Sequence, residues 1–149
     1  MTVSQRLYRR ATQVLIGGVL AWLLGLATSR AEKTLTGPWH ICAPFEKRIT
    51  CIVDGDTFWF QGEKMRLESV NTPEVDGPCA VEQALAREAR SMLLKLMSSE
   101  ATSIFRVGVD RYGRTLVQVR TADSSIGTRL LEHGLAETFG QRPRRDWCQ

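Results

Sequence analysis

Short stretches of alternating hydrophobic and polar residues follow one another between residues 49 and 70. Ile49–Val53, Thr57–Phe60 and a stretch that begins at Met65 each have the two-residue period of a β-strand. Turn sequences separate them, Asp54-Gly55-Asp56 before the second stretch and Gln61-Gly62-Glu63 before the third. This pattern predicts a meander of three short strands.

The hydrophobic period becomes helical between Val81 and Met97. Strands are predicted again at Thr102–Val109 and Thr115–Thr121, and a second helix should follow the capping residues Asp123-Ser124-Ser125 and end at His133-Gly134. Three strands, a helix, two strands and a helix are typical of the α+β class. We expect a five-stranded OB-fold β-barrel.

The first 31 residues have the layout of an export signal. Three arginines among the first ten residues precede Val14–Ala27, an apolar run of 14 residues. This run is short against the roughly 20 residues of a membrane-spanning helix. We expect a cleaved signal peptide and a periplasmic or secreted protein, with an uncleaved membrane anchor as the alternative. Residues 32–48 would form a lead-in segment, and residues 49–149 the folded domain.

The formal charge of +4 comes from this N-terminal segment. Residues 1–31 contain four arginines and no acidic residue, which leaves 16 basic and 16 acidic residues in the rest of the chain. Contact with a polyanion must therefore come from individually placed arginines, since the remainder of the chain has no net positive field.

The four cysteines all follow the signal, and none forms a Cys-x-x-Cys pair. With no histidine at ligand spacing either, a zinc cluster is not expected, and two disulfides in an oxidising compartment are. Four cysteines allow three pairings, and spacing alone does not decide among them. Of these we favour Cys42–Cys51 together with Cys79–Cys148.

Three polar clusters carry the candidate chemistry: Val53-Asp54-Gly55-Asp56-Thr57, then Arg66 with Asn71-Thr72-Pro73-Glu74, then Asp110-Arg111-Tyr112-Gly113-Arg114. Each cluster by itself is also ordinary turn or loop sequence. Together they supply oxygen ligands, a free carboxylate and guanidinium groups, as calcium-assisted attack of water on a phosphodiester requires.

The order and spacing of these clusters resemble the staphylococcal nuclease (thermonuclease) family over roughly residues 49–140. The resemblance implies an OB-fold barrel with about three helices and a calcium-dependent phosphodiesterase that acts on DNA and RNA. It makes Asp56 and Asn71 side-chain calcium ligands and Thr72 a ligand through its backbone carbonyl. Asp54 would lie just outside the ligands of the ion. We expect a monomer that has no stable protein partner and meets a membrane only if its N-terminal segment is uncleaved.

By the same resemblance, Glu74 is the general base, and Arg66 and Arg114 bind the phosphate. The chemistry of the reaction agrees with these roles. Attack on a phosphodiester adds negative charge in the transition state, and the planar forks of two arginines can bind its oxygens in pairs. A carboxylate near the attacking water can accept its proton.

Two departures from the family pattern bear on function. The family has aspartate where this chain has Asn71, which brings no charge and should weaken calcium binding. Beyond Gly134-Leu135-Ala136, the positions of two nucleotide-packing tyrosines hold Gly140 and Arg142, so that either Phe139 and Arg142 replace that platform or fewer contacts are made. Tyr112 and Arg111 are further candidate substrate contacts.

Three functional hypotheses follow from these residues. The first is an exported calcium-dependent nuclease. The second is an OB-fold module that binds nucleic acid with weak or no catalysis, because Asn71 replaces a charged ligand. The third is an extracellular interaction domain stapled by disulfides, in which Arg66, Glu74 and Arg114 come together by coincidence.

Overall fold

The computed structural model describes residues 33–35, 37–99 and 102–149. The export signal or membrane anchor predicted at residues 1–31 lies outside these residues and stays a prediction. Within the described part of the chain, no helix combines the length and the apolar character needed to cross a membrane.

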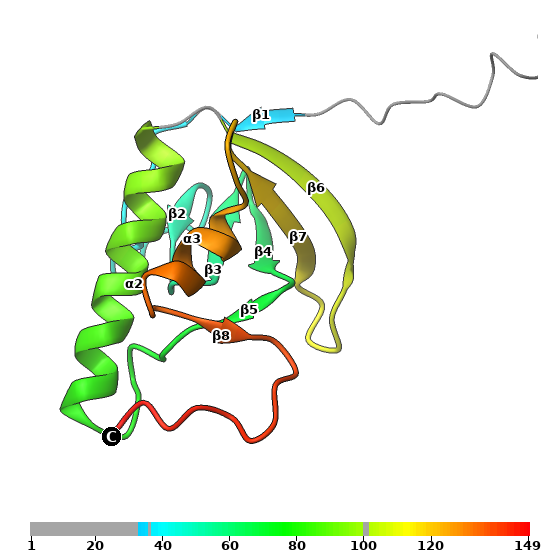
Figure 1. Ribbon diagram of the computed structural model, residues 1–149. Helices are drawn as coiled ribbons and strands as arrows, with labels where there is room; N and C mark the ends of the chain where they lie inside the picture. Colours follow the sequence, from blue (N-terminus) through cyan, green and yellow to red (C-terminus); the bar gives the residue numbers. More distant parts are fainter. Residues whose placement is uncertain (1–32, 36, 100–101) are drawn as a thin grey trace, which may run out of the picture. The chain divides into compact units, whose positions relative to one another are not determined.

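Six strands form one mixed sheet (Figure 1). In spatial order they are β1 (Lys33–Leu35), β6 (Thr102–Val109), β7 (Thr115–Arg120), β4 (Glu63–Leu67), β3 (Thr57–Phe60) and β2 (Cys51–Ile52). Neighbouring strands are antiparallel, except that β4 and β7 run parallel. A second, two-stranded ribbon pairs β5 (Val70–Asn71) with β8 (Glu137–Thr138). The fold is α+β, as the sequence predicts.

The closed five-stranded barrel expected from the sequence is not found in the described residues. The strands β1 and β2 lie at opposite edges of the six-stranded sheet, and no ladder joins them. The lead-in between them contains Pro38 and Pro44, which have no backbone N–H to donate to a ladder. The lead-in segment contains β1 near its start, a strand that the sequence analysis did not predict.

The two described helices lie close to their predicted positions. The first, α2, spans Ala80–Ser99, and the second, α3, spans Ile126–Glu132. The hydroxyl of the predicted cap residue Ser125 accepts a hydrogen bond from the Thr128 N–H, and Gly134 follows α3 with a φ of 68°. About three helices were expected, and the described residues contain two.

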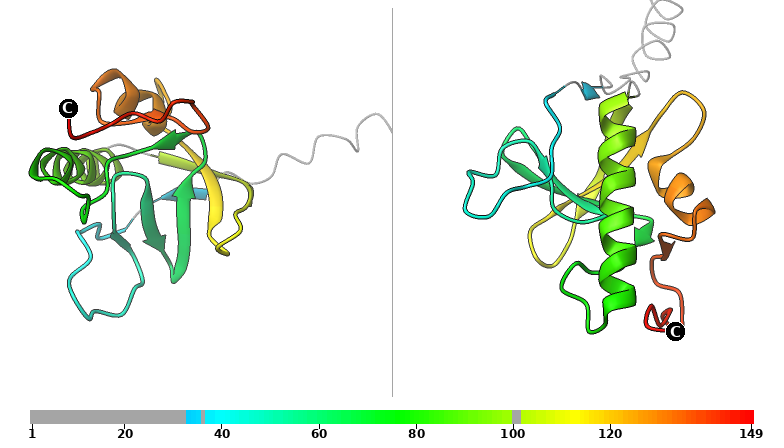
Figure 2. Two further views of the ribbon diagram at one scale, coloured as in Figure 1. Left: turned by 90° about the horizontal axis from the view of Figure 1, so that it is seen from below. Right: turned by 90° about the vertical axis from the view of Figure 1, so that its left-hand side faces the viewer.

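The hydrophobic core lies on one face of the sheet. Phe58, Met65, Leu67, Val117 and Val119 point to this face from β3, β4 and β7, and they pack with residues of α2 and α3. Figure 2 shows α2 running along one side of the sheet, with α3 next to it. Because side chains alternate along a strand, the residues between these positions point to the other face.

Two disulfides join the ends of the domain to its core, in the pairing that was expected. Cys42–Cys51 ties the lead-in to β2, and Cys79–Cys148 ties the C-terminal segment to the residue before α2. Figure 1 accordingly places the C-terminus beside the first turn of α2. The second bridge spans 69 residues of sequence and the first spans 9.

Both bridges should be intact in purified protein, with a mass about four hydrogens below the reduced value because each disulfide removes two. Replacing Cys79 and Cys148 together by serine should lower the melting temperature more than replacing Cys42 and Cys51. Loop entropy favours this order, at about 4 kcal/mol for the long loop against about 3 kcal/mol for the short one. Two titratable thiols in unreduced protein would contradict the prediction.

Candidate active site

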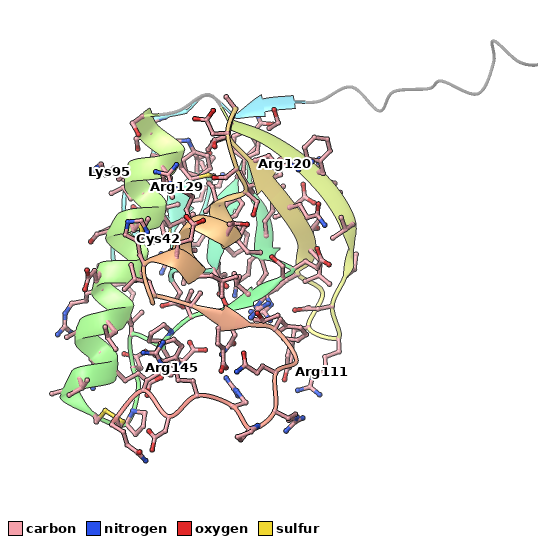
Figure 3. All side chains as sticks on the ribbon, viewed as in Figure 1. Cys42, Lys95, Arg111, Arg120, Arg129 and Arg145 are labelled. Carbon is pink, nitrogen blue, oxygen red and sulfur yellow. A yellow bond between two sulfur atoms is a disulfide. The ribbon has the colours of Figure 1, made fainter. Side chains whose placement is uncertain are left out.

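The three polar clusters of the sequence meet at one cavity of about 860 Å³. Its walls come from the loop before β3, the outer face of β4, the segment after β5, the hairpin between β6 and β7, and the segment after β8. The predicted residues that line it are Asp54, Asp56, Arg66, Asn71, Glu74, Arg111, Tyr112, Arg114 and Phe139. Figure 3 shows Arg111 on the hairpin, facing the segment that follows β8.

The floor of the cavity is the face of the sheet opposite the core. Thr57 on β3 is the register partner of Arg66 on β4, which in turn is the partner of Leu116 on β7. All three line the cavity. The strand alternation that sends Met65 and Leu67 into the core thus sends Arg66 into the site.

Arg66 is buried and bonded on several sides. Its guanidinium donates to the Asp56 carboxylate at 2.8 Å, to the Leu67 carbonyl at 2.9 Å and to the Asn71 Oδ1 at 3.3 Å. Its Cζ also lies 5.0 Å from the centre of the Phe139 ring. The buried charge is compensated by the Asp56 carboxylate, so the pair is held in one geometry.

Asp56 is held from both of its oxygens. Its Oδ1 accepts a hydrogen bond from the Thr57 hydroxyl at 2.8 Å, while Oδ2 accepts from Arg66 and, at 3.4 Å, from the Thr72 N–H. Thr72 itself is buried and does not line the cavity. The Thr72 peptide is therefore close to Asp56, as a shared ion site would require.

Asn71 connects this group to a residue that the sequence analysis did not find. Its Nδ2 donates at 3.1 Å to the carboxylate of Glu137, which is buried on β8. β8 is two residues long and follows an unpatterned segment, so no sequence signal marks Glu137. The cavity-lining residues Lys64 and Glu68 were also missed.

Two further carboxylates in the cavity have raised pKa values. Burial raises the pKa of Asp54, and the charge of Asp56 raises it further. Burial likewise raises the pKa of Glu74, followed by the charges of Asp54 and Asp56, against the opposing effect of Arg66. Both carboxylates thus bind a proton more readily than a solvated carboxylate does. For this reason Glu74 is a better proton acceptor than a solvated glutamate.

The loop that carries Asp54 and Asp56 is pressed against α2. A Cβ at Gly55 would stand 2.6 Å from the Cβ of Ala89 and 3.0 Å from the Thr72 Cγ2, so no larger residue fits without displacement. On the same side, Asp54 faces the charge of Arg90 from α2. The Asp54 Oδ1 is buried without a hydrogen-bond partner among the described residues.

Arg114 lies on the hairpin between β6 and β7. Asp110 accepts hydrogen bonds from the backbone N–H groups of Tyr112 and Arg114 and from the Arg114 Nε, the last at 2.7 Å. The Tyr112 ring contacts the guanidinium groups of both Arg111 and Arg114. No other hydrogen bond of the Arg114 guanidinium is seen in the described structure, which leaves its terminal nitrogens available to a ligand.

The C-terminal segment supplies one predicted residue and not the other. Phe139, 60% exposed, lies against Arg66 in the cavity wall. Arg142 is exposed and does not line the cavity, whereas Arg144 does and stands 3.6 Å from the Glu137 carboxylate. Arg142 as a substrate contact stays a prediction, and Arg144 is the arginine of this segment that lines the cavity.

The donor chemistry of the site fits calcium. The Asp56 carboxylate and the Asn71 amide oxygen are hard oxygen donors, and Asp54 adds a buried oxygen that lacks a partner. Arg66 already donates to both Asp56 and Asn71. The Asp56 and Asn71 oxygens thus already surround one cation, the Arg66 guanidinium. A calcium ion bound by these oxygens would have to share them with Arg66.

The sequence that forms this cavity is similar to known proteins. Residues 64–147 match the staphylococcal nuclease homologue family. The chain is 32% identical over 91 residues to a thermonuclease of Staphylococcus intermedius, covering 57% of this chain and 54% of the relative. It is 29% identical over 94 residues to an uncharacterized endonuclease of Haemophilus influenzae, covering 63% and 52%.

A third relative matches over more of the chain. The succinoglycan biosynthesis protein ExoI of Rhizobium meliloti is 32% identical over 139 residues, covering 89% of this chain and 66% of the relative. The chain spans about half the length of the first two relatives. Since the family match covers more than half of the sequence and includes Arg66, Asn71, Glu74 and Arg114, the chain belongs to the staphylococcal nuclease homologue family.

Proposed function

We propose that this chain is an exported, calcium-dependent nuclease that hydrolyses phosphodiester bonds of DNA and RNA. One observation carries the proposal: Arg66, Glu74 and Arg114 come from three separate segments and line one cavity together with Asp56. A simple interaction domain gives no reason for these side chains to share one cavity, in which burial raises the pKa of Glu74 and the charge of Arg66 opposes that rise. The names of two relatives, thermonuclease and endonuclease, support the same reaction.

In this proposal Glu74 accepts the proton of the attacking water. Its raised pKa makes it a stronger base than a fully solvated carboxylate, while the charge of Arg66 favours its ionised form. Asp54 and Asp56 raise the pKa of Glu74 by their charges, and all three line the cavity in which this base would take the proton of the water. Calcium, held by Asp56, Asn71 and the Thr72 carbonyl, would polarise the phosphate and the water.

The two arginines play unequal parts. Arg66 is already bonded to Asp56, Asn71 and Leu67, so it contributes a fixed positive charge at the floor of the cavity. Arg114 has terminal nitrogens that can bind phosphate oxygens in a fork, and Tyr112 and Arg111 flank it. We infer that Arg114 is the main phosphate ligand and that Phe139 offers a ring for a base.

Export is part of the proposal because of the apolar run at Val14–Ala27 and the two disulfides, which persist in oxidising compartments. A fusion of residues 1–31 to a reporter that is active only after export should be active in bacteria. An intact mass that corresponds to a chain starting after one of residues 27–31 would identify a cleaved signal. A full-length chain found in the membrane fraction would identify an anchor.

Glu74→Gln should lower the rate of DNA digestion in calcium by roughly 10²- to 10⁴-fold, because an amide cannot accept the proton. The measurement is plasmid digestion by folded protein in calcium and in chelator. The matched control is Glu132→Gln, at the exposed end of α3, which should digest at the parent rate. Parent protein that binds but does not cleave DNA in calcium would favour the binding module over the nuclease.

Arg114→Lys should leave the melting temperature near that of the parent and lower turnover by about 10²-fold, because lysine lacks the planar fork. Arg66→Lys should lower both turnover and stability, since it breaks a buried network. Arg111→Lys, in the same hairpin, is the control for Arg114 and should have the smaller effect. Equal turnover in the Arg114 variant and the parent would show that Arg114 does not bind the phosphate.

A further inference from the structure

Asn71 lies between two groups of opposite hydrogen-bonding character. Its Oδ1 accepts a hydrogen bond from Arg66 at 3.3 Å, and its Nδ2 donates one to Glu137 at 3.1 Å. A guanidinium can only donate, and a carboxylate can only accept. The amide therefore satisfies both neighbours in one orientation only, because a flip would set donor against donor and acceptor against acceptor.

Glu137 is itself held in place. It is the register partner of Asn71 in the β5–β8 ribbon, and it is 6% exposed. Its Oε2 accepts a hydrogen bond of 2.7 Å from the Arg145 N–H. Arg145 in turn donates to the Gly134 carbonyl and lies 4.2 Å from the centre of the buried Trp147 ring. The Glu137 carboxylate thus cannot turn away from Asn71 without leaving the Arg145 N–H unpaired.

We propose that Glu137 is a positioning residue, which fixes the Asn71 amide with its oxygen toward Arg66 and Asp56. It also determines which residue fits at position 71. An aspartate there would bring a second carboxylate to within hydrogen-bond distance of Glu137 with no proton between them. Asparagine and Glu137 form a matched pair, whose amide presents an oxygen to the site and an N–H to Glu137.

The hydrogen-bonding pair stands independently of the reaction, but its consequence for calcium rests on the proposed function. An amide binds a hard cation through its oxygen and not through its nitrogen. By fixing the amide, Glu137 keeps that oxygen on the side of Asp56. Loss of Glu137 should therefore weaken calcium binding even though Glu137 contributes no ligand atom.

The test exchanges the amide at position 71 and the carboxylate at position 137. In Asn71→Asp, two carboxylates face each other. The Asn71 Nδ2 and the Arg145 N–H donate to different oxygens of Glu137, and in Glu137→Gln one of those oxygens becomes an NH2 group that faces a donor. In the double variant N71D/E137Q, the carboxylate at 71 accepts from Arg66 and from the amide at 137, whose oxygen still accepts from the Arg145 N–H. The hydrogen bonds of positions 71 and 137 are thus restored in the double variant, whereas the 3.6 Å ion pair of Arg144 with Glu137 is lost equally in E137Q and in N71D/E137Q.

Thermal melts in chelator should show both single variants well below the parent, by about 4 °C or more, and the double variant above either of them. The control double variant is N71D/E68Q. Glu68 also lines the cavity but bonds to Gln118, so removal of its charge should not rescue the aspartate at 71. If a single variant fails to fold, a folded double variant gives the same result.

Additive losses in N71D/E137Q, or an equal rescue by N71D/E68Q, would overturn the pairing. The same melts with calcium test the consequence for the ion. The parent should gain melting temperature with calcium, E137Q should need more calcium for the same gain, and N71D/E137Q should need less than the parent because it adds a charged ligand. If the double variant is rescued in chelator but calcium stabilises no variant, the Asn71–Glu137 pairing stands and the calcium role is rejected. If calcium raises the melting temperature but the double variant is not rescued, the pairing is rejected and calcium binding stands.

Discussion

The buried ion pair between Arg66 and Asp56 is the interaction on which the site depends. Both side chains are nearly buried, and the 2.8 Å bond between them joins β4 to the loop before β3. Through Asp56 the pair also reaches the Thr72 backbone, and through Arg66 it reaches Asn71. Loss of either partner would leave an uncompensated charge, at a cost of roughly 3–5 kcal/mol. The residues that organise the site are thus also residues that hold its walls together.

This dependence separates the two arginines of the cavity. Arg66 is at the centre of a network whose acceptors are all on the chain itself, so the network fixes its position before any ligand arrives. Arg114 is held through its Nε by Asp110, on the same hairpin, and it lines the cavity. The two arginines are complementary. Arg66 provides a fixed positive charge at the floor of the cavity, and the guanidinium of Arg114 can bind the phosphate oxygens.

The sequence predicts those parts of the molecule that local pattern determines. Alternation places β3 and β6 at their observed bounds, and the cap at Ser125 places α3. Most of the predicted cavity residues were found because they fall in three motifs, whereas Lys64 and Glu68 lie outside those motifs and were missed. The open edges of the six-stranded sheet, where a closed barrel was expected, and the pairing of β5 with β8 were not predictable, since they depend on how distant segments meet. Glu137 escaped for that reason, because nothing near it in sequence indicates that it lies opposite Asn71.

The neutral residue at position 71 also follows from the charge already present in the cavity. Asp54, Asp56 and Glu74 lie close enough that their charges raise the pKa values of Asp54 and Glu74, which indicates unfavourable repulsion between them. Arg66 offsets part of it, and Glu137 adds a further buried carboxylate behind Asn71. A carboxylate at 71 would raise that repulsion whenever no ion is bound. An asparagine keeps an oxygen donor in the site without adding a charge. Compared with aspartate, it should therefore make the metal-free fold more stable and the affinity for calcium lower.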